Sequence, residues 1–545
     1  MSQFRFTTLI ISVFTAYLAL IFNIYNLQIQ KGQYYSARAQ SQYQLAGFLE
    51  PHRGAVYLTD KNNNLIPAAI NKSYSVIFAV PKEIKDLDRA IENLAPILNI
   101  EQEELRKKLS KGNLYELLLK RAADEQVKKV NEAQIKGIYV DEQDWRYYPF
   151  NNLAAQVLGF VGFSDSENKA EGKYGAEKYF NDLLSGQPGA IKGKEIVKPV
   201  QGSDIVLTID RDIQTEAENI LKKLIEEKRA TGGTVIVQEP KTGKIIALAN
   251  GPDFDPNSYS KYDLGNFINP VVQSVYEPGS VFKVITMAAG LDSGQITPQT
   301  TYYDTGVINF SDGKKIQNWD LKAHGRVAMS EIIEQSINTG SAFVESRIGH
   351  ENFYRYLNKF GFEDKSGISL PGEVTGNLKN IKNHKADIDF AAASFGQGIS
   401  VTPMQLIGSV SAIANGGKLL APFIIQNSEP QEIRQVISPE AAKKTTAMMV
   451  SAVRKAKAAD IPNYNIAGKT GTAQVPDFKR GGYTKDVINT YAGFAPASDP
   501  RFVILIKLDK PEGAPLAGAT VVPAFRELAQ FILNYYNIPP DALPQ

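Results

Sequence analysis

A serine and a lysine three residues apart form the clearest chemical pattern of the sequence, in the stretch YEPGSVFKVIT of residues 276–286. Ser280 follows Pro-Gly and opens an apolar run, so Ser280 and Lys283 are expected on one face near a helix N-terminus. Burial in this run disfavours an ammonium, so Lys283 could be neutral and accept the Ser280 proton, while the helix N-terminus favours the developing negative charge. The pattern predicts a serine nucleophile with a lysine base.

The motif S-x-x-K alone is weak, because about two copies are expected by chance in a chain of this length. Further copies begin at Ser166, Ser258 and Ser311. All three lie in polar stretches whose Gly, Pro, Asn and Asp residues are typical of loops. Only Ser280 opens an apolar helix, so the sequence context selects this copy.

Two other segments carry side chains that could complete such a site. Ser336-Ile337-Asn338 lies in EIIEQSINTGSAF. The alternative is structural: a helix that ends at Asn338 or Gly340, with Ser341 capping the next helix.

The segment Lys469-Thr470-Gly471-Thr472 lies in NYNIAGKTGTAQV and is consistent with a strand after a turn. A simple turn is the alternative, as Lys241-Thr242-Gly243 between two predicted strands illustrates. A phosphate-binding loop would need a glycine where Asn463 stands, so that interpretation fails.

Composition excludes several classes of function. The 60 Lys+Arg residues nearly balance 58 Asp+Glu residues, and no basic block is interleaved with aromatic residues, so no nucleic-acid partner is expected. The absence of cysteine excludes disulfides, thiol catalysis and zinc bound by cysteine, and suits an oxidising compartment. We expect no metal and no cofactor.

The N-terminus carries an apolar run, Leu9 to Leu27, close to the roughly 20 residues of a membrane-spanning helix. We favour an uncleaved signal anchor over a cleavable signal peptide, because the run is long and the small-residue site Ala37-Arg38-Ala39 lies well beyond it. A buried helix is less suitable, since a polar stripe is missing. The expected protein is a single-pass protein of the cell (inner) membrane whose bulk is extracytoplasmic.

The elements beyond this run predict two regions. From Lys31 to about Gln201 we expect a strand at Tyr74–Val80 and helices at Lys82–Leu94 and Glu101–Leu109, the second capped by Asn99. From Gly202 the pattern gives strands, then helices, then strands again. The clearest of these elements are a strand at 204–210, a helix at 214–228, a hairpin over 234–250, a strand at 502–508 and a closing helix at 524–535. This order predicts an α+β domain with an antiparallel sheet.

The three motifs occur in the order of the S-x-x-K, S-D-N and K-T-G set of penicillin-binding proteins and β-lactamases. The stretches EPGSVFK, FGFEDKSGISLPGE, SFGQGISVTPMQL and TYAGFAPASDPR resemble the transpeptidase domain of a class B penicillin-binding protein. Upstream, RGAVYLTDKNNN, and Gly175-Ala176-Glu177 with Leu183 and Gly186, resemble the pedestal module of that class. The resemblance implies an anchor with a short cytoplasmic segment over 1–30, a pedestal (dimerisation-like) domain over 31–201, and a domain of the penicillin-binding/β-lactamase-like fold over 202–545.

The resemblance also implies roles for the matching residues. Ser280 would attack the penultimate D-alanine of a peptidoglycan stem peptide and hold the acyl group, with Lys283 as base. Ser336 and Asn338 would shuttle the proton and orient the peptide, and Lys469 would support them electrostatically. The residues expected to receive the substrate carboxylate and to form the oxyanion hole are Thr470, Gly471 and Thr472, the oxyanion donors being the N–H groups of Ser280 and Thr472.

Within the class, YEPGSVFK and the short pedestal most resemble the division-specific FtsI type, although Ile337 stands where that type has a second serine. This implies septal cross-linking, with stem peptides and β-lactams as ligands and a membrane glycosyltransferase and divisome proteins as partners. The alternatives are an elongation-specific transpeptidase, a membrane-anchored D,D-carboxypeptidase or β-lactamase, and a non-catalytic penicillin sensor or scaffold. A glycosyltransferase module is not expected, since residues 31–200 lack its motif.

Overall fold

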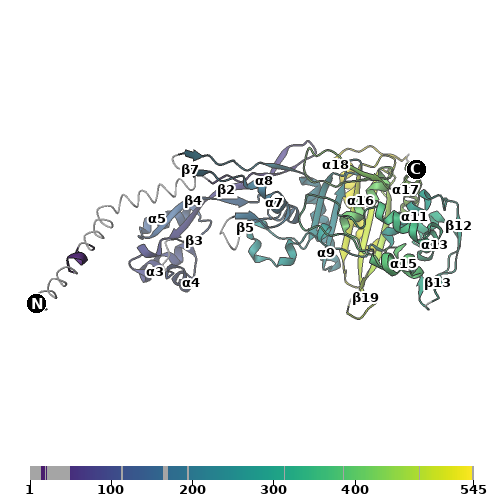
Figure 1. Ribbon diagram of the computed structural model, residues 1–545, viewed down its shortest axis with the longest axis horizontal. Coiled ribbons are helices and arrows are strands. Elements are labelled where there is room, and N and C mark those ends of the chain that lie inside the picture. The colour runs from purple at the N-terminus through teal and green to yellow at the C-terminus, as the bar shows by residue number, and fades with distance from the viewer. Residues whose placement is uncertain are drawn as a thin grey trace, which may run out of the picture. The chain divides into compact units, whose positions relative to one another are not determined.

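The computed structural model describes residues 14–18, 20, 50–111, 115–163, 170–192, 195–311, 313–384, 386–477 and 479–542 (Figure 1). The chain divides into two compact units, residues 1–54 with 182–203, and residues 55–181 with 204–545. The second unit contains both main sheets. Most of the predicted apolar span Leu9–Leu27 lies outside the described residues, and none of the helices described is long and apolar enough to cross a membrane.

The N-terminal sheet, as we name the first sheet of the second unit, has five strands. Their bounds are β1 (Val56–Thr59), β2 (Leu65–Ala79), β3 (Glu116–Leu119), β4 (Ile138–Tyr147) and β9 (Ile205–Asp210). Strand β9 pairs parallel to β1. The sheet therefore combines strands from both sides of the domain boundary predicted near Gln201, because β9 follows that boundary and the other four strands precede it. Three helices pack against strands β2, β3 and β4 of this sheet and enclose a small apolar core. They are α3 (Leu87–Leu98), α4 (Gln102–Leu109) and α5 (Asp124–Ala133).

Two predicted details of this region are wrong. Helix α3 begins at Leu87 rather than at Lys82, because the Asp86 side chain accepts a hydrogen bond from the N–H of Arg89 and so caps the helix there. Asn99 does not cap the second helix. It ends α3 in a left-handed conformation with φ of 56°, a role that asparagine also fills well. The predicted strand at Tyr74–Val80 belongs to the longer strand β2.

The C-terminal sheet is antiparallel throughout, with strand order β11-β10-β20-β19-β18, which confirms the predicted α+β domain and its hairpin. Its strands are β10 (Gly232–Gln238), β11 (Ile245–Gly251), β18 (Ala467–Pro476), β19 (Tyr483–Ala495) and β20 (Phe502–Asp509). The yellow arrows in Figure 1 are the last strands of the chain, beside the earlier β10 and β11. Strand β18, which carries the K-T-G motif, lies at one edge of the sheet.

Both faces of the C-terminal sheet are covered by helices. Helices α9 (Arg211–Lys228) and α18 (Val521–Tyr535) share one apolar core with sheet residues such as Val235, Ile504 and Ile506. The alternate residues, such as Ile236 and Leu505, point to the opposite face, and α16 (Pro403–Ala414) contacts β10, β19 and β20. Burial on both faces explains the nearly continuous apolar sequence of β20.

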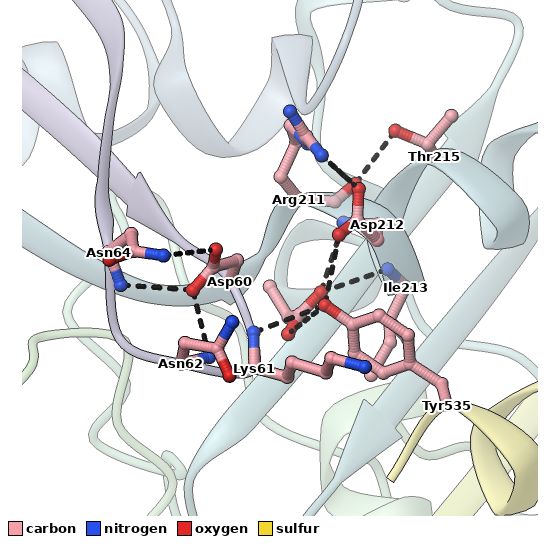
Figure 2. A network of polar contacts seen from close by, with 10 residues as sticks. Asp60, Lys61, Asn62, Asn64, Arg211, Asp212, Ile213, Thr215 and Tyr535 are labelled. Carbon is pink, nitrogen blue, oxygen red and sulfur yellow. Dashed lines mark hydrogen bonds and ion pairs between the residues drawn. The ribbon is translucent and has the colours of Figure 1, made fainter.

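A polar network joins the N-terminal strands to the C-terminal helix (Figure 2). After β1, Asp60 accepts hydrogen bonds from the N–H groups of Asn62 and Asn64, which fixes the turn into β2. The next N–H, of Lys61, donates to the Tyr535 hydroxyl at 3.1 Å, and that hydroxyl lies 3.0 Å from Asp212 at the start of α9. The D-K-N-N-N stretch therefore forms a turn that contacts α18 directly and is linked to α9 through the Tyr535 hydroxyl.

Candidate active site

Ser280 lies in a 3-10 turn, η5 (Gly279–Phe282), and Lys283 opens the α-helix α11 (Lys283–Asp292). The sequence predicted both residues at a helix N-terminus. In the structure the 3-10 turn that contains Ser280 ends at Phe282, and the α-helix begins at the next residue, Lys283. Gly279 has φ of +57°, a conformation that glycine adopts without strain. Ser280 is partly exposed, whereas Lys283 is 0% exposed. The nucleophile candidate is accessible and the base candidate is shielded from water.

The Lys283 amine contacts both polar residues of the S-x-N segment. Its Nζ lies 3.2 Å from Ser336 Oγ and 2.8 Å from Asn338 Oδ1, and it also donates to the backbone carbonyl of Ser336 at 2.5 Å. These residues are more than 50 positions away in the sequence. The structure thus brings together the first two predicted motifs.

Lys469 approaches the same hydroxyl from the edge strand β18. Its Nζ lies 3.0 Å from Ser336 Oγ, and only 4% of the residue is exposed. Ser336 Oγ therefore lies between two amines, those of Lys283 and Lys469. A hydroxyl in this position can pass a proton from one nitrogen or oxygen to another.

Burial lowers the pKa of both lysines. The pKa of Lys283 lies well below its usual 10.5, first because burial disfavours the ammonium and second because the charge of Lys469 is close. Burial alone lowers the pKa of Lys469 to about 7. Burial and the neighbouring charge both lower the pKa of Lys283, whereas burial alone lowers that of Lys469. We therefore expect Lys283 to be the neutral amine of the two.

Ser336 has an unusual backbone that aims its side chain at the two lysines. Helix α12 (Met329–Glu334) ends two residues earlier, and Ser336 has a left-handed φ of +58°. The N–H of Ile337 closes the helix by donating to the carbonyl of Ile332 at 3.0 Å, the bond of a Schellman motif, in which glycine is the usual left-handed residue. A serine there is strained, which is common at functional sites.

Asn338 begins a new helix, α13 (Asn338–Ile348), instead of ending one. The structural alternative of a helix running to Asn338 or Gly340 is therefore wrong. The side-chain amide of Asn338 donates to the carbonyl of Gln317 at 2.8 Å, which leaves Asn338 Oδ1 facing Lys283. Gln317 was not predicted, because a backbone carbonyl leaves no signal in the sequence.

Gly471 lets β18 lie directly against the nucleophile segment. A Cβ at this position would be 2.8 Å from the carbonyl oxygen of Pro278 and 3.2 Å from the N–H nitrogen of Val281. Strand residues 471–473 therefore flank Ser280, and the predicted strand with its K-T-G sequence is confirmed as β18. The close approach is the physical reason for the glycine.

The two threonines of β18 are both partly exposed. Thr470 accepts from Lys469 Nζ at its hydroxyl, at 3.3 Å, and at its carbonyl, at 3.1 Å. The Thr472 hydroxyl accepts from the N–H of Ala517 at 3.1 Å, which leaves its own proton available for a ligand. The backbone of Thr472 lies next to the Ser280 turn, where its predicted oxyanion role would require it.

The other S-x-x-K copies lie elsewhere. Ser258 is in the 3-10 helix η3 (Pro256–Lys261), and Ser311 is in the turn after β13 (Val307–Asn309). Ser166 is outside the described residues. Lys241-Thr242-Gly243 forms the turn between β10 and β11. In the described ranges, no group of three or more His, Asp or Glu residues is arranged to hold a metal ion.

Comparison with known proteins agrees with this geometry. The family model of the penicillin binding protein transpeptidase domain matches residues 233–530, and that of the penicillin-binding protein dimerisation domain matches residues 48–220. Stage V sporulation protein D of Bacillus subtilis is 33% identical over 505 residues, which cover 87% of this chain and 76% of that protein. The peptidoglycan D,D-transpeptidase FtsI of Buchnera aphidicola is 31% identical over 476 residues, covering 82% and 80%.

Among solved structures, penicillin binding protein 3 of Mycobacterium tuberculosis, complexed with aztreonam, superposes with a TM-score of 0.69. It is 27% identical and the match covers 91% of this chain and 99% of that chain. The chain belongs to the penicillin-binding protein transpeptidases. Because it joins the transpeptidase domain to the dimerisation domain, it is a class B member, and the family and transpeptidase activity predicted from the sequence are confirmed. The ligands are those of the family, peptidoglycan stem peptides and β-lactams.

Proposed function

We propose that the chain cross-links peptidoglycan through an acyl-enzyme on Ser280. Ser280 Oγ attacks the carbonyl of the penultimate D-alanine of a stem peptide, and its proton passes to Lys283. The bond to the terminal D-alanine then breaks, and that proton goes to the leaving amine. The amine of a second stem peptide attacks the ester and gives up a proton to Lys283, which returns a proton to Ser280 Oγ as the ester bond breaks, so that Ser280 is released and the cross-link forms.

The observation that carries this proposal is the fully buried Lys283, whose Nζ contacts Ser336 and Asn338 beside a second lysine. Burial favours the neutral form of an amine in this environment, and a neutral amine can accept a proton. Ser336 Oγ, which lies within 3.2 Å of both amines, offers the route by which the proton reaches the leaving group.

The remaining residues would bind and polarise the substrate. The N–H groups of Ser280 and Thr472 would stabilise the oxyanion, a type of contact worth about 3 kcal/mol. The hydroxyls of Thr470 and Thr472 would receive the terminal carboxylate, and a charged Lys469 would favour it. Asn338 would orient the peptide amide of the donor strand.

The cellular role follows from the relatives and from the sequence. We propose septal wall synthesis, because the FtsI relative covers 82% of the chain and the nucleophile motif is of the division type. Residues 1–30 would be the anchor, 31–201 the pedestal and 202–545 the catalytic domain, on the outer side of the cell membrane. A membrane glycosyltransferase and other divisome proteins would be its partners.

A labelled penicillin tests the chemistry. The purified chain should take up one label per molecule, and mass spectrometry of the digested adduct should place it on Ser280. The variant Ser280→Ala should take up none, while the matched variants Ser258→Ala and Ser311→Ala should be labelled as the wild type. A label on Ser166, Ser258 or Ser311 contradicts the assignment.

A further inference from the structure

The segment Tyr276–Gly279, immediately before Ser280, is held by the backbone of residues 396–401. Tyr276 and Val401 exchange two hydrogen bonds, of 3.0 and 2.9 Å, and the N–H of Gly279 donates to the carbonyl of Gly396 at 3.0 Å. A Cβ on Gly396 would be 2.4 Å from the carbonyl oxygen of Gly279. One side of the segment is therefore in direct backbone contact with this loop.

Strand β18 contacts the same segment. A Cβ on Gly279 would be 3.1 Å from the Cβ of Ala473, and a Cβ on Gly471 would be 2.8 Å from the carbonyl oxygen of Pro278. Farther along, Pro476 of β18 pairs with Tyr483, the first residue of β19. The segment thus contacts both a loop and the β18–β19 hairpin, which approach it from different parts of the chain.

The Glu277 carboxylate is bonded to both of these neighbours. Its Oε1 accepts from the N–H of Gly398 at 3.1 Å, and its Oε2 accepts from the Tyr483 hydroxyl at 3.1 Å. These partners are 121 and 206 residues away in the sequence. One side chain, three residues before the nucleophile, connects three segments.

The partners of Glu277 are neutral donors. In the described part of the chain, no lysine, arginine or histidine forms an ion pair with it. Burial raises the pKa of Glu277 to about 7, against the effect of its two hydrogen bonds. The site therefore holds the Glu277 side chain by directional hydrogen bonds and without a compensating cation, an arrangement that fixes geometry and gives little ion-pair stability.

We propose that Glu277 is a positioning residue for acylation. Its carboxylate clamps the nucleophile segment between the Gly398 loop and the β18–β19 hairpin, and so holds Ser280 in the orientation in which it meets the substrate carbonyl. Glu277 acts through this segment and contacts no reacting atom. The inference rests on the proposed assignment of Ser280 as nucleophile.

Acylation kinetics of the full chain with a chromogenic cephalosporin separate reversible binding from the chemical step. Glu277→Ala should lower the acylation rate constant about 10-fold to 100-fold with the dissociation constant nearly unchanged, because displaced reacting atoms lose rate rather than affinity. Glu277→Gln should recover most of the rate, since its Oε1 can accept from Gly398 and its amide can contact the Tyr483 hydroxyl. A wild-type rate constant for Glu277→Ala would overturn the proposal, as would a failure of Glu277→Gln to recover.

Removal of the Tyr483 hydroxyl tests the clamp without a core substitution, since Tyr483 is 42% exposed. Tyr483→Phe should lower the acylation rate constant about threefold to tenfold in the wild type and have no further effect in Glu277→Ala. Tyr262→Phe, another exposed tyrosine, is the matched control and should be silent. If Glu277→Ala does not fold, Tyr483→Phe decides alone: an unchanged acylation rate constant overturns the clamp, and a lowered one supports it. Acylation of Ser280→Ala would instead refute the proposed function.

Discussion

Two regions of the molecule bury charged side chains, in opposite ways. In the N-terminal part, Arg146 of β4 and Glu177 of α7 (Gly175–Tyr179) form an ion pair of 2.6 Å with side-chain exposures of 4% and 0%. In the candidate active site, Lys283 and Lys469 have the same sign of charge and share one hydroxyl, that of Ser336. The first site pairs opposite charges, whereas the second places two groups of the same charge close together.

The two arrangements of buried charge have different consequences, one for the stability of the fold and one for the chemistry of the site. A buried pair of opposite charges keeps both groups ionised, and removal of one partner leaves an uncompensated charge in the protein. Two buried amines of like charge disfavour each other's protonation, which lowers the pKa of an amine and makes it a better base at neutral pH. We therefore expect changes in the first region to reduce the stability of the fold, and changes in the second to reduce the rate of acylation.

The largest effect is expected at Lys283. Lys283→Met keeps the apolar stem and removes the amine, so penicillin acylation should fall by about 10³-fold, within the range of general-base catalysis. The circular dichroism spectrum should remain that of a folded protein. Acylation near the wild-type rate would show that another group accepts the Ser280 proton.

The matched change in the ion pair should affect stability. Glu177→Gln leaves Arg146 buried without its counter-charge and should lower the free energy of unfolding by about 3 kcal/mol in urea titrations. The folded fraction should acylate at the wild-type rate. Slower acylation with unchanged stability would contradict the division of roles between the two regions.

A smaller effect is expected where the edge strand meets the nucleophile segment. Gly471→Ala places a Cβ 2.8 Å from the carbonyl oxygen of Pro278, so β18 or the segment must shift, and acylation should slow about tenfold. Gly265→Ala is the control, because its added Cβ would have no heavy atom within 4 Å outside its own stretch of backbone. Equal rates for both variants would show that the contact is not critical.

The smallest effect is a shift in pH dependence. Acylation needs neutral Lys283, so its rate falls as the pH drops through the pKa of that lysine. Lys469→Met removes the like charge that lowers this pKa, although burial, the larger cause, remains. The acidic limb of the pH–rate profile should therefore move to higher pH. An unmoved limb, or a shift to lower pH, would contradict the coupling of the two lysines.

Much of the site could be predicted because its motifs are local in sequence. Ser280 and Lys283 belong to one turn of chain, and the context of Pro-Gly and apolar residues distinguished them from the other copies. The segment that carries Lys469 is bounded by glycines, which is consistent with the strand that the structure shows. The antiparallel sheet followed from the order of strands and helices along the chain.

Features that depend on distant contacts could not be predicted. The left-handed backbone of Ser336 has no sequence signal, since glycine or asparagine is the residue expected there. Asn99 fits either end of a helix, and in the structure it ends α3 while Glu101 precedes α4. The link from Glu277 to Tyr483 spans 206 residues, so nothing near either residue indicates it.

The proposed acylation of Ser280 depends most directly on the protonation state of Lys283. Its Cε resonance, observed by NMR in protein labelled with ¹³C at Cε of lysine and assigned by its absence in Lys283→Met, can be followed through a pH titration. This resonance should titrate well below 10.5, the usual pKa of a lysine. A midpoint near 10.5 would contradict the account, because a protonated Lys283 could not accept the proton of Ser280.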